Sequence, residues 1–157
     1  MAIHHDLTVK GDTLEARAWG FDESLEDVQS YGLAIIQACR EQGVTRVLCD
    51  ERELEYRLNT FEHYEAAEFI AQQVPAVAKA AIVCNPQSLS AVDLYEDVAV
   101  NRGLMLRIFT DIDQAWAWLE DTAPSGRAPP RRWHRLRVLM LTGRPCPRSP
   151  DGEQCCP

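Results

Sequence analysis

Hydrophobic and polar positions alternate along the first 122 residues with the spacings of strands and helices in turn. Residues 7–9 and 14–19 alternate around Gly11 and Asp12, which predicts an N-terminal β-hairpin. Three later apolar runs are short and bounded by polar residues, which is typical of interior strands. These runs are residues 44–50, 80–84 and 105–109.

Helical spacing of apolar residues fills the stretches between these strands. Four helices are predicted: from Ser24 to Gly43, from Asn59–Thr60 to Pro75, from Ser88 or Ser90 to Gly103, and from Asp111 through Leu119. Two of them begin with a capping box, in which an N-cap side chain accepts from the first turn. The pairs are Ser24 with Asp27, and Asp111 with Gln114. Gly103 is expected to end the third helix by adopting the left-handed backbone conformation.

The order of elements is two strands, then helix and strand in alternation, ending on a helix. It predicts an α/β fold with a mixed sheet and right-handed crossovers. One segment stays open: residues 51–58 alternate Leu54, Tyr56 and Leu58 with charges, which fits an ordered loop or an edge strand.

Composition divides the chain after Thr122. Residues 1–122 hold 9 basic and 22 acidic residues, a formal charge of −13, whereas residues 123–157 hold 7 Arg, 2 acids and 7 of the 9 prolines. We therefore expect a domain over 1–122 and a mostly disordered Arg-, Pro- and Cys-rich tail over 123–157. A shifted or extended reading frame is an alternative origin for that tail.

Charge and hydropathy also narrow the function classes. An acidic domain repels phosphate backbones, so we expect no nucleic-acid binding by residues 1–122. No apolar run is long enough for a transmembrane segment, and the first residues do not resemble a signal peptide, so we expect a cytoplasmic protein. Cys39, Cys49 and Cys84 lie among apolar neighbours and are expected in the core as free thiols.

Two stretches carry a resemblance to a known family: VTRVLCDERELE at residues 44–55 and NRGLMLRIFTDIDQAWAWL at residues 101–119. Over residues 3–121 the chain resembles STAS domains, and among them the small SpoIIAA-like, or STAS/SEC14, bacterial proteins. The resemblance implies a four- to five-stranded sheet with about four helices, packed largely on one face, and a non-enzymatic role.

The resemblance also implies a regulatory position, because better-known members are phosphorylated on a Ser at the start of the helix after the third strand. That helix begins here at Asn59–Thr60, where the usual Asp-Ser pair is replaced by Asn-Thr. Thr60 is the candidate phosphorylation site. The alternative, which the residues favour, is that its hydroxyl group caps the helix and contributes about 1 kcal/mol.

No motif for bond-making chemistry, cofactor or metal binding is present in the sequence. His63, beside Glu62, is interpreted as an exposed helix histidine. Asp50 and Glu51 end a predicted strand, where α/β sheets often bind ligands, but solvated loop carboxylates are the simpler interpretation. In the last helix, we expect Trp116 in the core and Trp118 exposed, which makes Trp118 a candidate interface residue.

Three functions follow. The leading hypothesis is a non-catalytic STAS-like module that binds a protein partner or self-associates, with a dimer as one form. The second is a carrier of a small apolar molecule or lipid, suggested by Tyr56, Phe61 and Tyr64. The third is an enzyme that uses Asp50, Glu51 and His63 in one cleft. Together the candidate ligand or partner residues are Asp50, Glu51, Tyr56, Phe61, His63, Tyr64 and Trp118.

Overall fold

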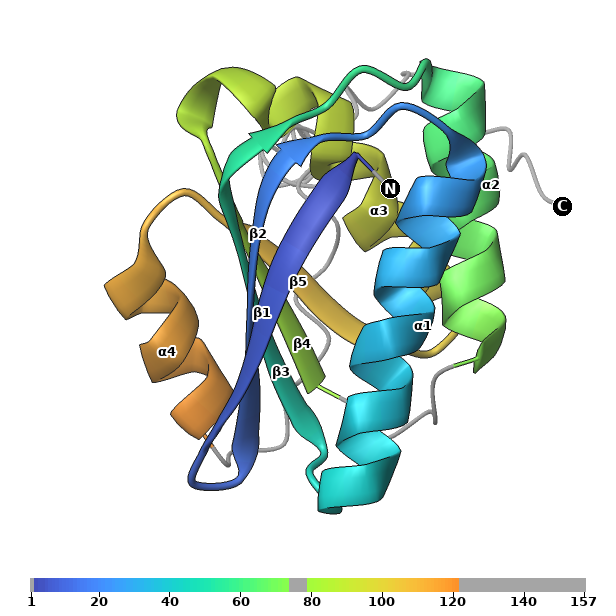
Figure 1. Cartoon of the computed structure of the whole chain (residues 1–157). Helices are drawn as coiled ribbons and strands as arrows, with labels where there is room; N and C mark the ends of the chain where they lie inside the picture. The colour runs from blue at the N-terminus through green and yellow to red at the C-terminus, as the bar shows by residue number, and fades with distance from the viewer. Residues whose placement is uncertain (1, 74–78, 122–157) are drawn as a thin grey trace, which may run out of the picture. The chain divides into compact units, whose positions relative to one another are not determined.

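The computed structural model describes residues 2–73 and 79–121, and all of these lie within one compact unit, Met1–Thr122. They form five strands in one sheet, whose spatial order is the order along the chain (Figure 1). The strands are β1 Ile3–Lys10, β2 Thr13–Phe21, β3 Arg46–Glu55, β4 Lys79–Cys84 and β5 Met105–Phe109. β1 and β2 form the predicted antiparallel hairpin, and every later pairing is parallel. The expected mixed α/β sheet is thus confirmed.

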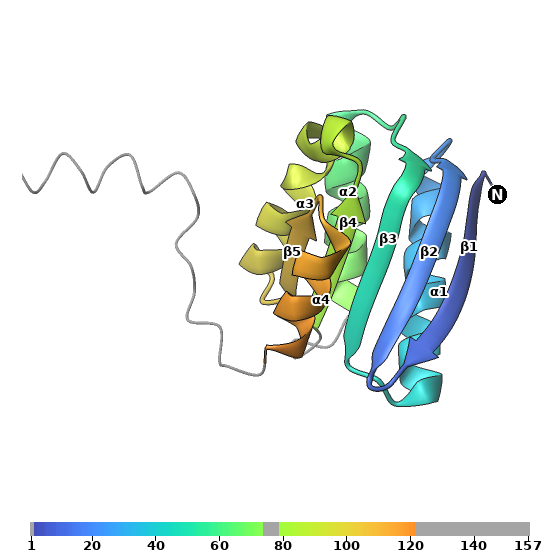
Figure 2. The same ribbon diagram turned by 90° about the vertical axis from the view of Figure 1, so that its left-hand side faces the viewer.

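Helices cover both faces of this sheet, but unequally (Figures 1 and 2). α1 Leu25–Gln42, α2 Thr60–Gln73 and α3 Leu89–Asn101 lie on one face, and α4 Ile112–Glu120 lies on the other. A short 3₁₀ turn, η1 Pro86–Ser88, precedes α3. The expectation of helices packed largely on one face is therefore confirmed.

Local side-chain chemistry sets most helix boundaries. The Ser24 hydroxyl group accepts from the Asp27 amide at 3.2 Å, and the Asp111 carboxylate accepts from the Gln114 amide at 2.9 Å, as predicted. Gly43 ends α1 at a φ of 66°, and Gly103 lies just beyond α3 at a φ of 83°. Side chains with a Cβ atom rarely adopt this left-handed conformation, so glycine is favoured at both turns.

The start of α2 differs from the prediction. The side chain of Asn59, rather than that of Thr60, caps this helix, because its Oδ1 accepts from the amides of Phe61 and Glu62 at 3.0 and 3.1 Å. The Glu62 carboxylate in turn accepts from the Asn59 amide at 3.0 Å, which completes a capping box. Thr60 is the exposed first residue of the helix.

Residues 51–55 are neither loop nor edge strand. They extend β3, which lies between β2 and β4 in the middle of the sheet. Pairing with β2 shifts register between Arg17 and Trp19, so an irregularity interrupts the ladder opposite the charged stretch of β3. The charges misled the prediction because this end of the strand projects beyond β4, whose pairing with β3 ends at Glu51.

The face under α4 holds a cluster of buried apolar side chains: Leu48, Ala81, Val83, Ala115 and Leu119. Trp116 and Trp118 both pack against this cluster and are both partly buried, so the expected contrast between them is wrong. The Trp118 ring lies 5.7 Å from that of Phe109, and the Lys79 ammonium group sits 4.4 Å from its centre. A cation and a second ring therefore cover the side chain that we expected to be exposed.

The predictions for the tail, residues 123–157, lie outside the described residues, as does the predicted end of the second helix at Pro75. Within the described ranges, no helix has the length and apolar character needed to cross a membrane.

Candidate functional site

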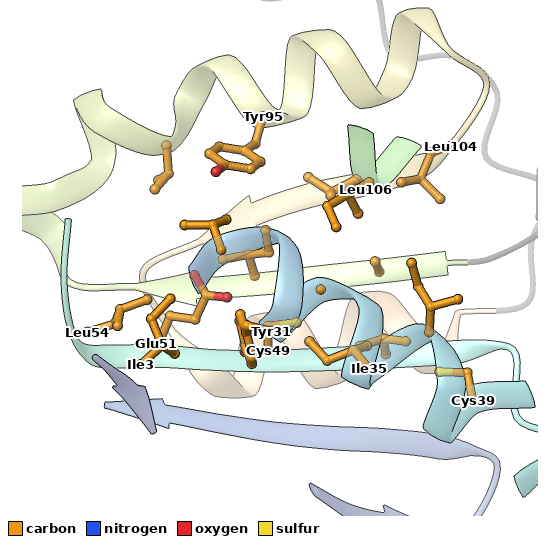
Figure 3. Close-up of a pocket in the computed structure, with 18 of the residues that line it drawn as sticks. Ile3, Tyr31, Ile35, Cys39, Cys49, Glu51, Leu54, Tyr95, Leu104 and Leu106 are labelled. Carbon is orange, nitrogen blue, oxygen red and sulfur yellow. The ribbon is translucent and has the colours of Figure 1, made fainter. Parts of the chain in front are cut away.

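A cavity of about 370 Å³ lies between the sheet and the three helices of the larger layer. Its walls come from β3, β4 and β5 on the sheet side and from α1, α2 and α3 on the other. Figure 3 shows that Cys39, Leu104 and Leu106 lie toward one end, and Glu51, Leu54 and Tyr95 toward the other. Most of its lining is aliphatic, which is the usual character of a site for small apolar ligands.

Glu51 provides a carboxylate inside this cavity. Alternation along β3 turns Cys49 and Glu51 toward the helices and Leu48 and Asp50 toward α4, so the Glu51 side chain is only 7% exposed. The Tyr56 hydroxyl group donates to its Oε2 at 2.5 Å. Burial raises the pKa of Glu51 to about 7, although the hydroxyl groups of Tyr56 and Tyr31 oppose the shift. The interpretation of Glu51 as a solvated loop carboxylate is therefore wrong.

Asp22 holds the loop after β3 against the end of β2. Its Oδ1 accepts from the backbone amides of Arg57 and Leu58, the latter at 3.1 Å, and its side chain is 1% exposed. These bonds tie the residues between β3 and α2 to the carboxyl end of β2, which brings Tyr56 and α2 over the cavity. Burial raises the pKa of the Asp22 carboxyl group.

His63 is buried, contrary to the prediction, with 2% exposure. Its ring lies 6.0 Å from that of Tyr56 and 5.7 Å from that of Tyr95, and its Nδ1 is 3.4 Å from the Tyr95 hydroxyl group. Its Nε2 is 4.0 Å from the Asp22 carboxylate and makes no hydrogen bond of standard geometry within residues 2–73 and 79–121. Burial lowers the pKa of His63, so the neutral form is favoured.

Tyr31, from α1, is a further polar side chain that reaches the cavity. It is 5% exposed, and its hydroxyl oxygen has no partner in hydrogen-bond geometry among the described residues. Burial raises its pKa well above the ordinary value, and the neighbouring Cys49 and Glu51 add to the shift. A buried hydroxyl group that faces a cavity without a partner can bind a polar group of a ligand.

The candidate residues thus divide into separate places. Glu51 and Tyr56 meet at the cavity, and His63 packs directly behind Tyr56. Asp50 lies on the opposite face of the sheet in an ion pair with Arg52 at 2.7 Å. The structure therefore does not bring Asp50, Glu51 and His63 into one cleft.

Phe61 and Tyr64, the two aromatic candidates on α2, do not reach the cavity. Phe61 is 67% exposed and Tyr64 is 40% exposed, so neither belongs to the cavity. The buried residues of α2 are His63, Ala66 and Ala67. Trp118 lies on the far face, under α4.

Sequence reasoning missed Asp22 and Tyr31 as site residues. Tyr31 follows Val28 by three positions on the apolar face of α1, so a polar tip on a buried stripe was a usable signal. Asp22 comes directly after β2. Its role depends on hydrogen bonds to a chain segment that lies 35 residues further along the sequence. That role could not be predicted from local pattern. No group of three or more metal-ligand side chains gathers in the described part of the chain.

A hairpin-led mixed sheet, with three helices on one face and one on the other, defines the class of STAS-type α/β domains, and comparisons with known proteins agree. The family model for SpoIIAA-like proteins matches residues 12–120, so the chain belongs to the SpoIIAA-like family.

One similar structure is an anti-sigma factor antagonist from Mycobacterium paratuberculosis, with a TM-score of 0.56 and 11% identity over 76% of this chain and 95% of that one. Another is an uncharacterised protein with a SpoIIAA-like fold from Shewanella loihica, with a TM-score of 0.47 and 17% identity over 75% of this chain and 94% of that one. No curated protein matches the sequence.

Proposed function

We propose that this chain is a non-catalytic binding protein that holds a small apolar molecule in the cavity beneath α1, α2 and α3. The carrying observation is the cavity itself, about 370 Å³ of mostly aliphatic lining inside a small domain. A concave site of this volume, lined mainly by aliphatic side chains with a few polar groups, is the usual form of a small-molecule site.

Cavity filling tests the proposal. Val47 lines the cavity from β3 and is 7% exposed, whereas Val100 lies on α3 and is 54% exposed. The full chain should bind the neutral fluorophore N-phenyl-1-naphthylamine, and Val47→Phe should weaken binding by at least about tenfold because its ring occupies the volume. Val100→Phe makes the same change at the surface and should bind as the parent does.

Two results would overturn the proposal: no binding of the fluorophore by a folded parent chain, or unchanged binding by a folded Val47→Phe. Circular dichroism and thermal unfolding of each variant establish folding. If Val47→Phe does not fold, Ala80→Val, on the neighbouring strand β4, makes a smaller intrusion into the same cavity and should weaken binding less.

A second candidate is the protein-interaction role, supported by the aromatic side chains exposed on α2. The fold is shared with an anti-sigma factor antagonist, and Phe61 and Tyr64 lie three positions apart, hence on neighbouring surface of one helix. Such a pair is the kind of side chain enriched at interfaces. Self-association or a separate protein partner would cover it.

A photo-crosslinking amino acid in place of Phe61 tests this candidate. It should give a covalent protein adduct in cells, and the same amino acid in place of Leu33, 41% exposed on α1, should not. Equal or absent adducts at both positions would count against the surface. Thr60, next to Phe61, stays the proposed phosphorylation position, and intact mass spectrometry of the chain from its native cells would detect the added phosphoryl group.

A further inference from the structure

The polar end of the cavity is acidic, and none of the described residues that line this end carries a positive charge. Glu51 and Asp22 both line it, and both are nine-tenths or more buried. The Asp22 carboxylate accepts from the backbone amides of Arg57 and Leu58, whereas the groups that act on Glu51 are the uncharged hydroxyl groups of Tyr56 and Tyr31. A buried carboxylate without a positive partner is costly to ionise, and a cation that reached it would recover that cost.

Positive charge among the described lining residues is confined to Arg40. Arg40 follows Cys39, which lies at the opposite end of the cavity in Figure 3, and its guanidinium group donates to the Gln73 carbonyl oxygen at 3.1 Å. Burial lowers the pKa of His63, which lies behind Tyr56, and this disfavours its cationic form. The described residues therefore leave the charge of Glu51 unbalanced.

Three tyrosines surround this carboxylate. Tyr56 donates to it, and Tyr31 and Tyr95 line the cavity beside it, as Figure 3 shows for the two latter side chains. The Tyr31 hydroxyl group is buried and close enough to Glu51 to lower the pKa of that carboxyl group. Among the described residues nothing donates to its oxygen, so this oxygen can accept a hydrogen bond from a ligand. Aromatic faces beside a carboxylate are the surroundings in which proteins bind alkylammonium groups.

We propose that the cavity selects an apolar molecule with a protonated amine head, whose ammonium group binds Glu51 and the Tyr31 hydroxyl oxygen while its hydrocarbon tail extends toward Leu104 and Leu106. This inference rests on the proposed function and adds the chemical class of the ligand. An ammonium group brings three donors, which suits two acceptors and an aromatic wall. An anionic head of the same length would meet Glu51 and Asp22 and be repelled by both.

Three probes that differ only in the head group test the selection. Calorimetric titration of the full chain near neutral pH with decylamine, decanol and decanoate should give the tightest binding for decylamine. We expect decylamine to bind at least about tenfold more tightly than decanol, and decanoate to bind most weakly, because charge-assisted hydrogen bonds are about twice as strong as neutral ones.

Matched variants assign the selection to one side chain. Glu51→Gln keeps the size of the side chain and removes its charge, so decylamine affinity should fall by at least about tenfold while decanol affinity changes by less than about threefold. Asp50→Asn makes the corresponding change one residue away, on the opposite face of the sheet, and should leave both affinities unchanged. Tyr31→Phe removes the unpartnered hydroxyl group and should lower decylamine affinity as well, which provides a second variant if Glu51→Gln does not fold.

The outcomes separate this inference from the proposed function. Equal binding of the three probes, or preference for decanoate, would overturn the amine selection and leave apolar binding intact. Unchanged decylamine affinity in folded Glu51→Gln would overturn the role of Glu51. Failure of the folded parent to bind any probe, the neutral fluorophore included, would overturn the proposed function itself.

Discussion

The side chains on the two faces of the sheet pack in different ways. Under α4, Ala81 and Ala115 let helix and sheet approach closely, and Leu48, Val83 and Leu119 fill the space between them. Under α1, α2 and α3, larger side chains enclose a cavity and surround a buried carboxylate. Successive side chains of β3 point to opposite faces of the sheet, so Leu48 packs under α4 and Glu51 lines the cavity on the other face.

The difference indicates where stability and binding are located. Close packing maximises dispersion contacts and leaves no room for a ligand. A cavity with polar groups lowers the stability of the fold but provides space for a ligand, and functional sites commonly show this trade-off between stability and function. We therefore infer that the α4 face stabilises the domain and the opposite face binds, and four predictions test this division, from the largest effect to the smallest.

Truncation of one aliphatic side chain on each face gives the largest expected contrast. Leu119 is 0% exposed, and Leu119→Ala should lower the free energy of unfolding by about 2–5 kcal/mol because close neighbours cannot fill the void. Ile35→Ala borders a volume that is already unfilled, so it should cost about half as much or less. Urea unfolding of both variants measures the two costs. Equal costs would contradict the division between faces.

Glu51 should make stability depend on pH. Its pKa is raised from 4.5 to about 7, so the folded state holds a proton that the unfolded state releases, and stability falls as pH rises from about 4.5 through 7. The loss attributable to Glu51 reaches at most about 3 kcal/mol above pH 7. Urea unfolding near pH 5 and near pH 8 measures it.

Glu51→Gln is the control for that dependence, because other groups titrate in the same range. The raised pKa of Asp22 acts in the same direction as that of Glu51, and the lowered pKa of His63 acts in the opposite one. The difference between parent and variant isolates Glu51. A parent and a variant with the same pH dependence would contradict the assignment.

We expect Asp22 to stabilise the loop between β3 and α2 at the polar end of the cavity. Asp22→Ala leaves the amides of Arg57 and Leu58 buried without an acceptor and should cost about 2–3 kcal/mol. Asp22→Asn retains an oxygen acceptor and should cost less. Amide hydrogen exchange of residues 56–58 should accelerate in Asp22→Ala, and protection equal to that of the parent would show that other contacts hold this loop.

Most of the fold could be predicted from the sequence because the signals that set its elements are local. The hairpin around Gly11 and the caps at Ser24 and Asp111 each depend on residues within a few positions, and the structure contains each of them. Residues 51–55 were ambiguous because their charges fit an edge, whereas their place in the middle of the sheet depends on pairing with β2. Pairing between distant segments is not encoded in a local pattern.

The candidate site was predictable in part. Glu51 and Tyr56 were named for their place after a strand and their aromatic character, and both reach the cavity. The burial of His63 was missed because it depends on Tyr56, Tyr95 and Asp22, which three other parts of the chain supply. A polar residue that is buried by tertiary contacts has the same local pattern as one that is exposed.

The smallest expected effect distinguishes two neighbours at the start of α2. Asn59→Ala removes the acceptor of the Phe61 and Glu62 amides and should cost about 1 kcal/mol in the free energy of unfolding. Thr60→Ala leaves this cap intact and should change stability by less than about 0.5 kcal/mol, because the side chain is exposed. Urea unfolding of both variants measures the difference. A larger cost for Thr60→Ala would return the capping role to Thr60, and it would also remove the reason for regarding its hydroxyl group as available for modification.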